Sequence, residues 1–416
     1  MKRIIASAGV VALGATGVHA LDYAPGFGST DMAKPWSVSL TLRGFYDDNY
    51  LTRAGDELDS WGFTLRPAGS VAYSTGLTDV GARYAFTAYY FADRPGTDWD
   101  FAHQFDGYLS HAFSHRYNLF ITDSFVFARE PELFEYDLPY RSDMDHLRNV
   151  GTITLNAQMT QLLTLVLGYS NSYYDYEQEG LGSLSARLDR VEHLISANLQ
   201  WQLLPTTVGV VGYQFGLIDF ISDDELVPGY SSDIRNSYNH YIYVGADHAF
   251  NPDLTASARV GTQYADFYNH PGGFDQWEPY ANVSLRYRYG QGSFAEAGFI
   301  QQYTRTDVRA LTASSSIGYA SIRHAFTPTR EGSILGRIQY SVFDGQIPGV
   351  RDYSDWSQLH YAVGLNLTYA FNRHVSAEIG YNFDQLDSDE KFERYQIWER
   401  WDFTRNRVYF GVTAKY

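Results

Sequence analysis

Apolar and polar residues alternate along almost the whole chain, and this period of two is the feature that most constrains the fold. In the segment 36–43, WSVSLTLR, every second residue is apolar and the residues between them are Ser, Thr or Arg. Successive side chains of a β-strand point to opposite faces, so such a segment has one apolar and one polar face. A soluble sheet buries its apolar face in a core, whereas a barrel in lipid turns that face outward.

Segments of this kind recur from residue 36 to the last residue. We count eighteen of them, and an even number allows the first strand to close on the last. The sequence therefore predicts an all-β fold, a transmembrane antiparallel up-and-down β-barrel with these strands: 36–49, 59–74, 78–91, 99–113, 117–129, 148–160, 163–176, 188–203, 207–220, 237–250, 254–268, 277–290, 293–306, 312–326, 331–343, 356–371, 375–386 and 401–416. The alternation is weakest in the fourth, thirteenth and fourteenth segments, where His103, Glu296 or the run Ser314 to Ser316 blurs the two faces.

The connections between these segments alternate in length. Eight are tight, and nine are longer and carry Pro, Gly and acidic residues. Short turns on one side and long loops on the other are typical of outer-membrane barrels, which predicts periplasmic turns and acidic extracellular loops. A soluble propeller is the rival fold, but it requires a blade repeat of about 40–50 residues, and no motif recurs beyond the hairpin rhythm.

The N-terminus predicts export. Residues 1–20 have a basic start, an apolar stretch from Ile4 to Val18 and a small-residue cleavage site that ends at Ala20, as in a signal peptide. Residues 21–35 are expected to be a short periplasmic segment, and residues 36–416 the barrel. No other stretch approaches the 18 consecutive apolar residues of a transmembrane helix.

Composition supports the same class. The chain has no cysteine, so an exported protein of this length must be stabilised without disulfides, as a closed barrel is by its strand pairing. Its 35 Tyr and 8 Trp suit the aromatic belts at membrane interfaces. The formal charge of −17 argues against a nucleic-acid partner.

The last strand carries a candidate assembly signal. Phe410, Val412 and Tyr416 lie on its apolar face, and Tyr416 is the final residue. A terminal aromatic on an alternating last strand looks like the signal read by the outer-membrane insertion machinery, which is therefore an expected partner.

The chain also resembles the beta-barrel porin 2 family of bacterial outer-membrane proteins. The resemblance is strongest in Gly44 to Tyr50, GFYDDNY, and continues in the aromatic hairpins Ala85 to Phe91 and Tyr280 to Tyr289. It implies a barrel in the outer membrane of a Gram-negative bacterium. Members are often linked to exopolysaccharide export, so the resemblance adds polysaccharide and its export components as candidate partners.

The polar face of each strand supplies the candidate pore-lining residues. If the apolar face meets lipid, the inward cations form two basic walls: Arg43, Arg66, Arg83, Arg405 and Arg407, and then Arg259, Arg286, Arg288 and Arg337. Inward acids are expected to oppose them, namely Asp79, Asp106, Glu192, Glu278, Glu296 and Glu378. Opposed walls of opposite sign would create a transverse field that orients polar solutes. The alternative is that the arginines form ion pairs with acids on neighbouring strands.

We find no signature of an enzyme or of a cofactor site. The chain lacks a Gly-x-Ser-x-Gly elbow and a His-Glu-x-x-His motif. His146 follows Asp143 and Asp145 in a predicted loop, where we expect it to be solvated. The acidic loops do not match a calcium-binding loop, so we expect solvated carboxylates and no metal.

These features favour a porin-like channel for passive passage of small polar solutes or of oligo- and polysaccharide. The loop from Arg129 to Leu147 is the candidate to fold into the lumen, and a row of inward tyrosines would favour sugars: Tyr241, Tyr243, Tyr280 and Tyr409. The alternative is a structural or adhesive surface protein without an open channel. Outer-membrane lipid and lipopolysaccharide are the expected surroundings in both cases.

Overall fold

The protein is a β-barrel that closes on itself. The computed structural model describes residues 35–128, 145–304, 310–345, 347, 356–389 and 402–416. The predicted segment 1–20 and all of the predicted segment 21–35 except Pro35 lie outside the described residues, as does most of the loop from Arg129 to Leu147. Within the described part, no helix is long and apolar enough to cross a membrane.

The predicted all-β class is confirmed by a single antiparallel sheet of eighteen strands. Its strands are β1 (Trp36–Asp47), β2 (Ser60–Ser74), β3 (Thr78–Phe91), β4 (Trp99–Ala112), β5 (Tyr117–Ala128), β6 (His146–Gln158), β7 (Leu163–Tyr176), β8 (Arg190–Leu204), β9 (Thr207–Phe220), β12 (Ser237–Ala249), β13 (Leu254–Phe267), β14 (Phe274–Gly290), β15 (Ser293–Thr304), β16 (Thr312–Thr327), β17 (Arg330–Asp344), β18 (Ser357–Ala370), β19 (Val375–Ser388) and β20 (Phe403–Lys415).

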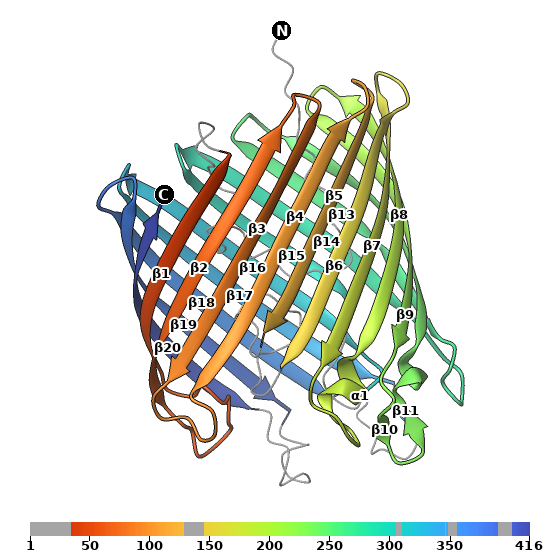
Figure 1. Cartoon of the computed structure of the whole chain (residues 1–416). Helices are drawn as coiled ribbons and strands as arrows, with labels where there is room; N and C mark the ends of the chain where they lie inside the picture. Colours follow the sequence, from red (N-terminus) through yellow and green to blue (C-terminus); the bar gives the residue numbers. More distant parts are fainter. Residues whose placement is uncertain (1–34, 129–144, 305–309, 346, 348–355, 390–401) are drawn as a thin grey trace.

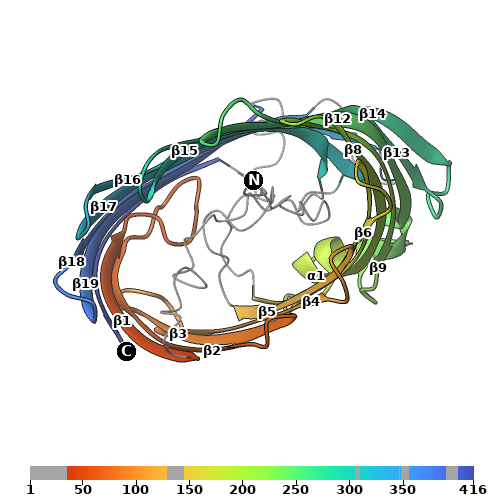
Figure 2. The ribbon, with the colours of Figure 1, turned by 90° about the horizontal axis from the view of Figure 1, so that it is seen from above.

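Each strand pairs with its neighbours in sequence, and β1 also pairs with β20. Arg43, for example, lies opposite Thr64 of β2 on one side and Gly411 of β20 on the other. The pairing of the first and last strands closes the ring, whose cross-section is oval (Figure 2). A closed ring leaves no sheet edge without hydrogen-bond partners.

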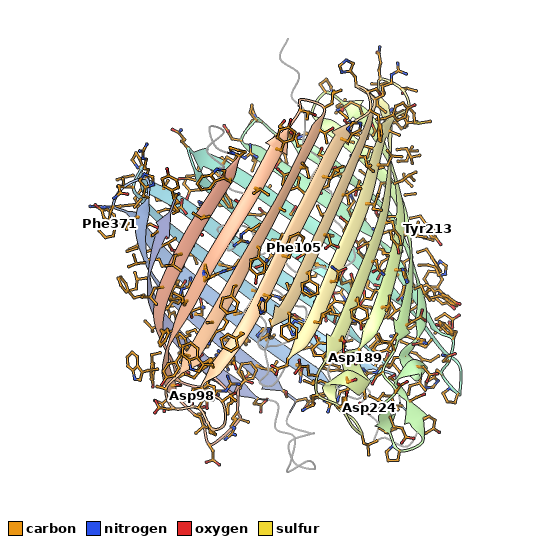
Figure 3. All side chains as sticks on the ribbon, viewed as in Figure 1. Asp98, Phe105, Asp189, Tyr213, Asp224 and Phe371 are labelled. Carbon is orange, nitrogen blue, oxygen red and sulfur yellow. The ribbon has the colours of Figure 1, made fainter. Side chains whose placement is uncertain are left out.

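The two ends of the barrel differ, as the connection lengths predicted (Figure 1). The short-turn end carries tight hairpins, such as the one between β2 and β3, and both Trp36 and Tyr416. The long-loop end carries elements that the sequence did not predict: α1 (Leu184–Leu188), the hairpin of β10 (Glu225–Val227) and β11 (Tyr230–Ser231), and the 3-10 helix η1 (Ser232–Arg235). Acidic residues such as Asp98, Asp189 and Asp224 lie at this end (Figure 3).

The outer face of the wall is apolar. Val38, Leu40 and Leu42 of β1 are each about half exposed, at 49%, 47% and 53%, because they point away from the barrel. Figure 3 shows Tyr213 projecting outward in the same way. Exposed aromatic side chains gather at both ends of this face, among them Trp61, Trp99 and Trp277 near the loops and Trp36, Phe113, Trp201, Phe250, Phe326, Phe371 and Tyr416 near the turns. Two aromatic belts that flank an apolar band match the surface of a barrel in a bilayer.

Three histidines also lie on this apolar face, and one of them, His103, is the residue that blurs the alternation of the fourth segment. His103 accepts or donates a hydrogen bond with the Tyr84 hydroxyl, and its Nδ1 lies 2.7 Å from that oxygen. Tyr169 pairs with His193 at 2.9 Å and Tyr213 with His240 at 2.8 Å in the same manner. Each imidazole therefore has a cross-strand partner, which lowers the cost of placing a polar ring on the apolar face.

The wall parts locally between β14 and β15. Their pairing ends at Ala281 and Gln301, so no backbone pairing between β14 and β15 continues from there toward the long-loop end. Polar contacts instead reach past the gap to the next strands: the backbone amide of Tyr303 on β15 donates to Gln263 of β13 at 3.1 Å, and Ser314 of β16 donates to Glu278 of β14 at 3.2 Å. A small apolar cluster that includes Leu226, Phe267 and Tyr303 brings β10, β13 and β15 into contact.

Candidate functional site: the inward face of the barrel

The inward face carries the charges of the wall. All of the charged residues singled out from the sequence lie at inward-facing positions, because each one faces the side opposite to the exposed apolar residues of its strand. The first basic wall occupies adjacent strands, with Arg405 and Arg407 on β20, Arg43 on β1, Arg66 on β2 and Arg83 on β3. The second is interrupted: Arg259 lies on β13 and Arg286 and Arg288 on β14, whereas Arg337 lies on β17.

The expectation that acids face these walls across the lumen is wrong. Glu378 lies on β19 and accepts from Arg43 at 2.7 Å, so the acid belongs to the same wall as its arginine. Asp106 lies 3.7 Å from Arg83, and Glu296 lies 3.7 Å from Arg286, in each case on the adjacent strand. Inward side chains of neighbouring strands are about 5 Å apart, which an arginine spans easily. These three acids therefore pair with arginines in their own part of the wall, as in the alternative arrangement considered from the sequence, and their charges are balanced locally.

The most buried ion pair among the described residues joins the two terminal strands. Asp47 of β1 is fully buried and accepts from both Arg405 and Arg407 of β20. The Arg405 Nη2 atom lies 2.6 Å from Asp47 Oδ2, and its Nε atom lies 3.0 Å from the same oxygen. Such a charge-assisted, multidentate contact fixes the register of β1 against β20.

A second network lies nearer the short-turn end of the same strands. The guanidinium of Arg43 lies 4.3 Å from the centre of the Tyr409 ring while it donates to Glu378. Asn366 donates to the Tyr409 hydroxyl at 3.0 Å and to Glu378 at 3.3 Å. Strands β18, β19, β20 and β1 are thus connected through one set of polar contacts.

The remaining arginines have different partners. Arg66 donates to Gln104 at 3.2 Å, and Arg337 donates to Gln339 at 2.6 Å. Arg259 pairs with Asp247 at 2.8 Å, an inward acid that we did not single out although it follows the same alternation. Arg288 is exposed near the turn between β14 and β15.

The inward tyrosines do not offer open ring faces. Tyr243, Tyr280 and Tyr409 are each only 2% exposed. Four inward tyrosines lie flat over a glycine of the neighbouring strand: Tyr108 over Gly81, Tyr243 over Gly212, Tyr319 over Gly298 and Tyr409 over Gly380. A Cβ atom at Gly380 would lie 2.1 Å from the Tyr409 ring. Tyr241, the remaining member of the predicted row, is partly buried and accepts a hydrogen bond from Gln263 at 2.9 Å. Three of the four tyrosines therefore complete the wall and present almost no surface on which a sugar could stack.

At the long-loop end a short helix lies within the outline of the ring. Figure 2 shows α1 inside the oval, next to the wall. Leu184 and Leu188 of α1 pack against Tyr174 and Tyr176 of β7, so the helix is attached to the inward face. The predicted lumenal loop from Arg129 to Leu147 lies mostly outside the described residues, so its place stays a prediction. The loop between β7 and β8, which the sequence did not single out, lies within the ring.

Buried polar groups hold this loop. Asp189 accepts from the Tyr176 amide at 2.7 Å and from the Ser185 hydroxyl. Burial raises the pKa of the Asp189 carboxyl to about 6. His146 is also buried, at 1% exposure, and stacks on Tyr176. The expectation of a solvated His146 is wrong because His146 begins β6 and points to the inward face.

The predicted assembly residues lie on the outer face. Phe410 is 57% exposed, Val412 is 39% exposed and Tyr416 is 61% exposed, and Tyr416 contacts Trp36 with ring centres 5.7 Å apart. Their role in insertion stays a prediction. Among the described residues, no group of three or more His, Cys, Asp or Glu side chains has the arrangement of a metal site.

The fold and this face define a class: a closed antiparallel barrel with an apolar outside and a charged inside. Comparison with solved structures finds several bacterial proteins of similar fold, among them an outer membrane protein and a porin. The outer membrane protein OpdK from Pseudomonas aeruginosa is 13% identical with a TM-score of 0.48, and a BenF-like porin from Pseudomonas fluorescens is 11% identical with a TM-score of 0.47; each covers 92% of this chain and 99% of its own. OccAB4 from Acinetobacter baumannii gives 12% identity and a TM-score of 0.45 over the same shares.

Comparison of the sequence with known proteins assigns no family to this chain. No protein-family model matches the chain, and no curated protein matches it. The structural likenesses are too distant to carry function to this chain. Its function has to be inferred from the strand pairings and from the chemistry of the two faces.

Proposed function

We propose that this protein is a channel of the Gram-negative outer membrane through which small polar solutes pass by diffusion. The observation that carries the proposal is the division of the wall into two faces. Apolar side chains with aromatic belts cover the outside, whereas the arginines and acids of the predicted pore lining lie on the inside. Barrels of 16–18 strands are wide enough to hold an aqueous channel.

The same division supports a location in lipid and lipopolysaccharide, with the acidic loops outside the cell and the short turns in the periplasm. Export with a cleaved signal peptide and recognition by the insertion machinery belong to this proposal. We do not extend it to polysaccharide, because the inward tyrosines lie buried against glycines and other side chains. Catalysis has no part in it.

Ion preference tests the proposal. Replacing Arg286 and Arg288 together by Gln removes two positive charges from the inward face, so the reversal potential in a planar bilayer should shift toward cations. The shift should be larger at low salt than at high salt, because salt screens fixed charges over roughly 10 Å at 0.1 M.

The matched control is Arg330→Gln, which removes one positive charge from the outer face at the same end of the barrel. It should leave the reversal potential unchanged. The proposal fails if the wild-type barrel, inserted in the bilayer, gives no open-channel steps, since a sealed structural or adhesive protein would behave in that way.

A further inference from the structure

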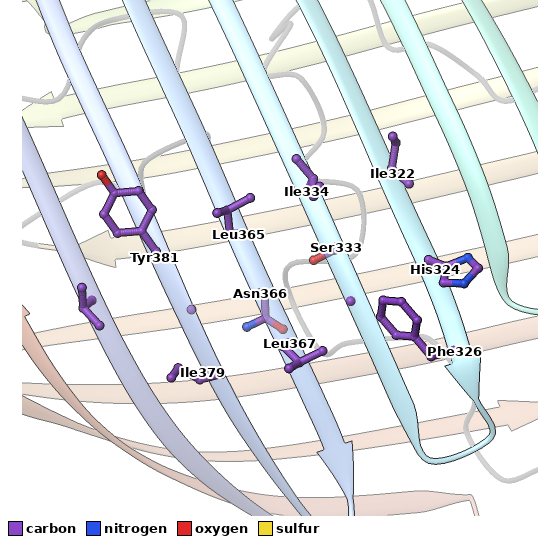
Figure 4. Close-up of a pocket in the computed structure, with 13 residues that line it drawn as sticks. Ile322, His324, Phe326, Ser333, Ile334, Leu365, Asn366, Leu367, Ile379 and Tyr381 are labelled. Carbon is purple, nitrogen blue, oxygen red and sulfur yellow. The ribbon is translucent and has the colours of Figure 1, made fainter.

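The outer wall contains a groove over β16 to β19, toward the short-turn end. Its volume is about 450 Å³, within the range of small-molecule sites. Figure 4 shows its lining from outside the barrel: Ile322 and Phe326 lie on β16, Ile334 on β17, Leu367 on β18 and Ile379 on β19. Nearly all of the surface that these residues present is hydrocarbon.

The groove exists because a glycine, which has no side chain, occupies an outward position of β17. Gly332 of β17 occupies an outward position between Leu367 of β18 and the ring of Phe326. A Cβ atom at Gly332 would lie 3.0 Å from the Phe326 ring, so a larger side chain would fill the groove at this point. The neighbouring apolar side chains project past the glycine and form the sides of the groove.

A cation lies at the end of the groove nearest the turns. Arg330 is on the same face of β17 as Gly332, two residues closer to the turn, and is exposed. Its guanidinium lies 5.7 Å from the centre of the Tyr369 ring. In the part of the chain that the structure describes, no carboxylate lies within ion-pair distance of Arg330.

We propose that this groove binds an anionic phospholipid, with one acyl chain over Gly332 and the phosphate at Arg330. The inference rests on the proposed placement in a membrane, which puts the groove in the hydrocarbon region and Arg330 at the level of the headgroups. Arginine binds phosphate through two parallel N–H donors, and basic residues at the edge of an apolar groove are a known means of holding anionic headgroups.

The shape favours a lipid over a second copy of this chain. A stable protein contact buries more than about 1,000 Å² between well-matched surfaces, whereas this hollow is narrow and accepts one chain-like group. Charge complementarity points the same way, because Arg330 requires an anion, and the groove behind it offers only apolar contacts.

Native mass spectrometry of the whole barrel tests the proposal. The purified protein is reconstituted in nanodiscs of equal phosphatidylglycerol and phosphatidylcholine, transferred to detergent, and the retained lipid is counted. Wild type should retain about one phosphatidylglycerol in preference to phosphatidylcholine. Gly332→Leu should reduce the retained lipid several-fold by filling the groove, and Arg330→Gln should abolish the preference for the anionic lipid.

Two control variants carry the same kinds of substitution at positions outside the groove. Gly336→Leu places the same side chain at an outward position of β17 with no atom within 4 Å, and Arg373→Gln removes an exposed cation from the turn between β18 and β19. Both should retain lipid as wild type does. Heat-modifiable gel mobility identifies folded protein, and Arg330→Gln keeps the test valid if Gly332→Leu does not fold.

Equal retention by wild type, Gly332→Leu and Arg330→Gln would overturn the proposal. So would a change of oligomeric state in Gly332→Leu without any change in lipid, because the groove would then belong to a contact between copies. Bilayer conductance, measured on the same samples, tests the proposed channel separately from the proposed lipid site. A barrel that holds phosphatidylglycerol but never conducts would contradict the channel and leave the lipid site standing.

Discussion

The junctions β1–β20 and β14–β15 have equally short ladders but differ in how they are held. Each has nine paired positions. Between β1 and β20 the contact continues on both faces, since Asp47 holds Arg405 inside while Asn406 donates to Asp48 outside at 2.7 Å. Between β14 and β15 the ladder ends at Ala281, and the charge pair nearest to it, Arg286 with Glu296, is a loose contact of 3.7 Å.

The two junctions differ because only one of them joins strands that are consecutive in the chain. A short turn connects β14 to β15, so these strands stay together even where their ladder is broken. No turn connects β1 to β20, so the closing junction depends on side chains and backbone hydrogen bonds alone. We therefore infer that the ion pairs between Asp47 and the arginines of β20 hold the closing junction together, a task that the covalent turn performs between β14 and β15.

The comparison predicts its largest effect at Asp47. Asp47→Asn removes the buried acceptor of two guanidinium groups, of which that of Arg405 is fully buried, and should destabilise the barrel by about 3–5 kcal/mol, the usual cost of breaking a buried ion pair. The matched change Glu296→Gln at the other junction should cost about 0–1 kcal/mol, because Arg286 is partly exposed there. Unfolding by denaturant in lipid vesicles measures both. Equal losses would show that the two junctions are held in the same way.

A smaller difference is expected at the tyrosines that cover glycines. Gly380→Ala should cost about 1–3 kcal/mol, because the Tyr409 ring lies against the new methyl group and is held in place by Arg43 and Asn366. Gly298→Ala disturbs Tyr319 of β16, for which no hydrogen bond is described, so that ring is free to shift and the cost should be lower. The same unfolding titration measures both losses of stability. A greater loss for Gly298→Ala than for Gly380→Ala would contradict the inference that side-chain contacts hold the closing strands together.

The smallest effect concerns a buried carboxylate without an arginine contact like that of Asp47. Burial raises the pKa of Asp189 to about 6 from an ordinary value of 3.8, so the folded loop binds the proton more tightly than the unfolded chain does. The stability that this provides is fully present below about pH 3.8 and is lost as the pH rises through about 6.

Amide hydrogen exchange at Tyr176, whose N–H donates to Asp189, measures this loss once the intrinsic pH dependence is subtracted. Protection should fall between about pH 4 and 6 in wild type and stay level in Asp189→Asn. An equal fall in both proteins would assign the effect to another group.

The sequence by itself determined the number of strands and which residues share a face. Period-two alternation is a local property, because successive side chains of a strand must point to opposite sides whatever lies next to it. For that reason Arg43, Arg83 and Glu378 could be placed on the inward face, and Phe410 and Tyr416 on the outward face, without a structure. The blurred fourth segment shows the limit, since the polar ring of His103 lies outward only because Tyr84 of the adjacent strand supplies its partner.

Only the tertiary structure decided which inward residues meet. Arg43 and Glu378 are 335 positions apart and become neighbours because the ring closes with one particular register between β19, β20 and β1. A shift of two residues in that register would keep every side chain on its face and change every partner. The local ion pairs, the parting of β14 from β15 and the covered tyrosines all follow from the register and curvature of the closed sheet, which local alternation does not encode.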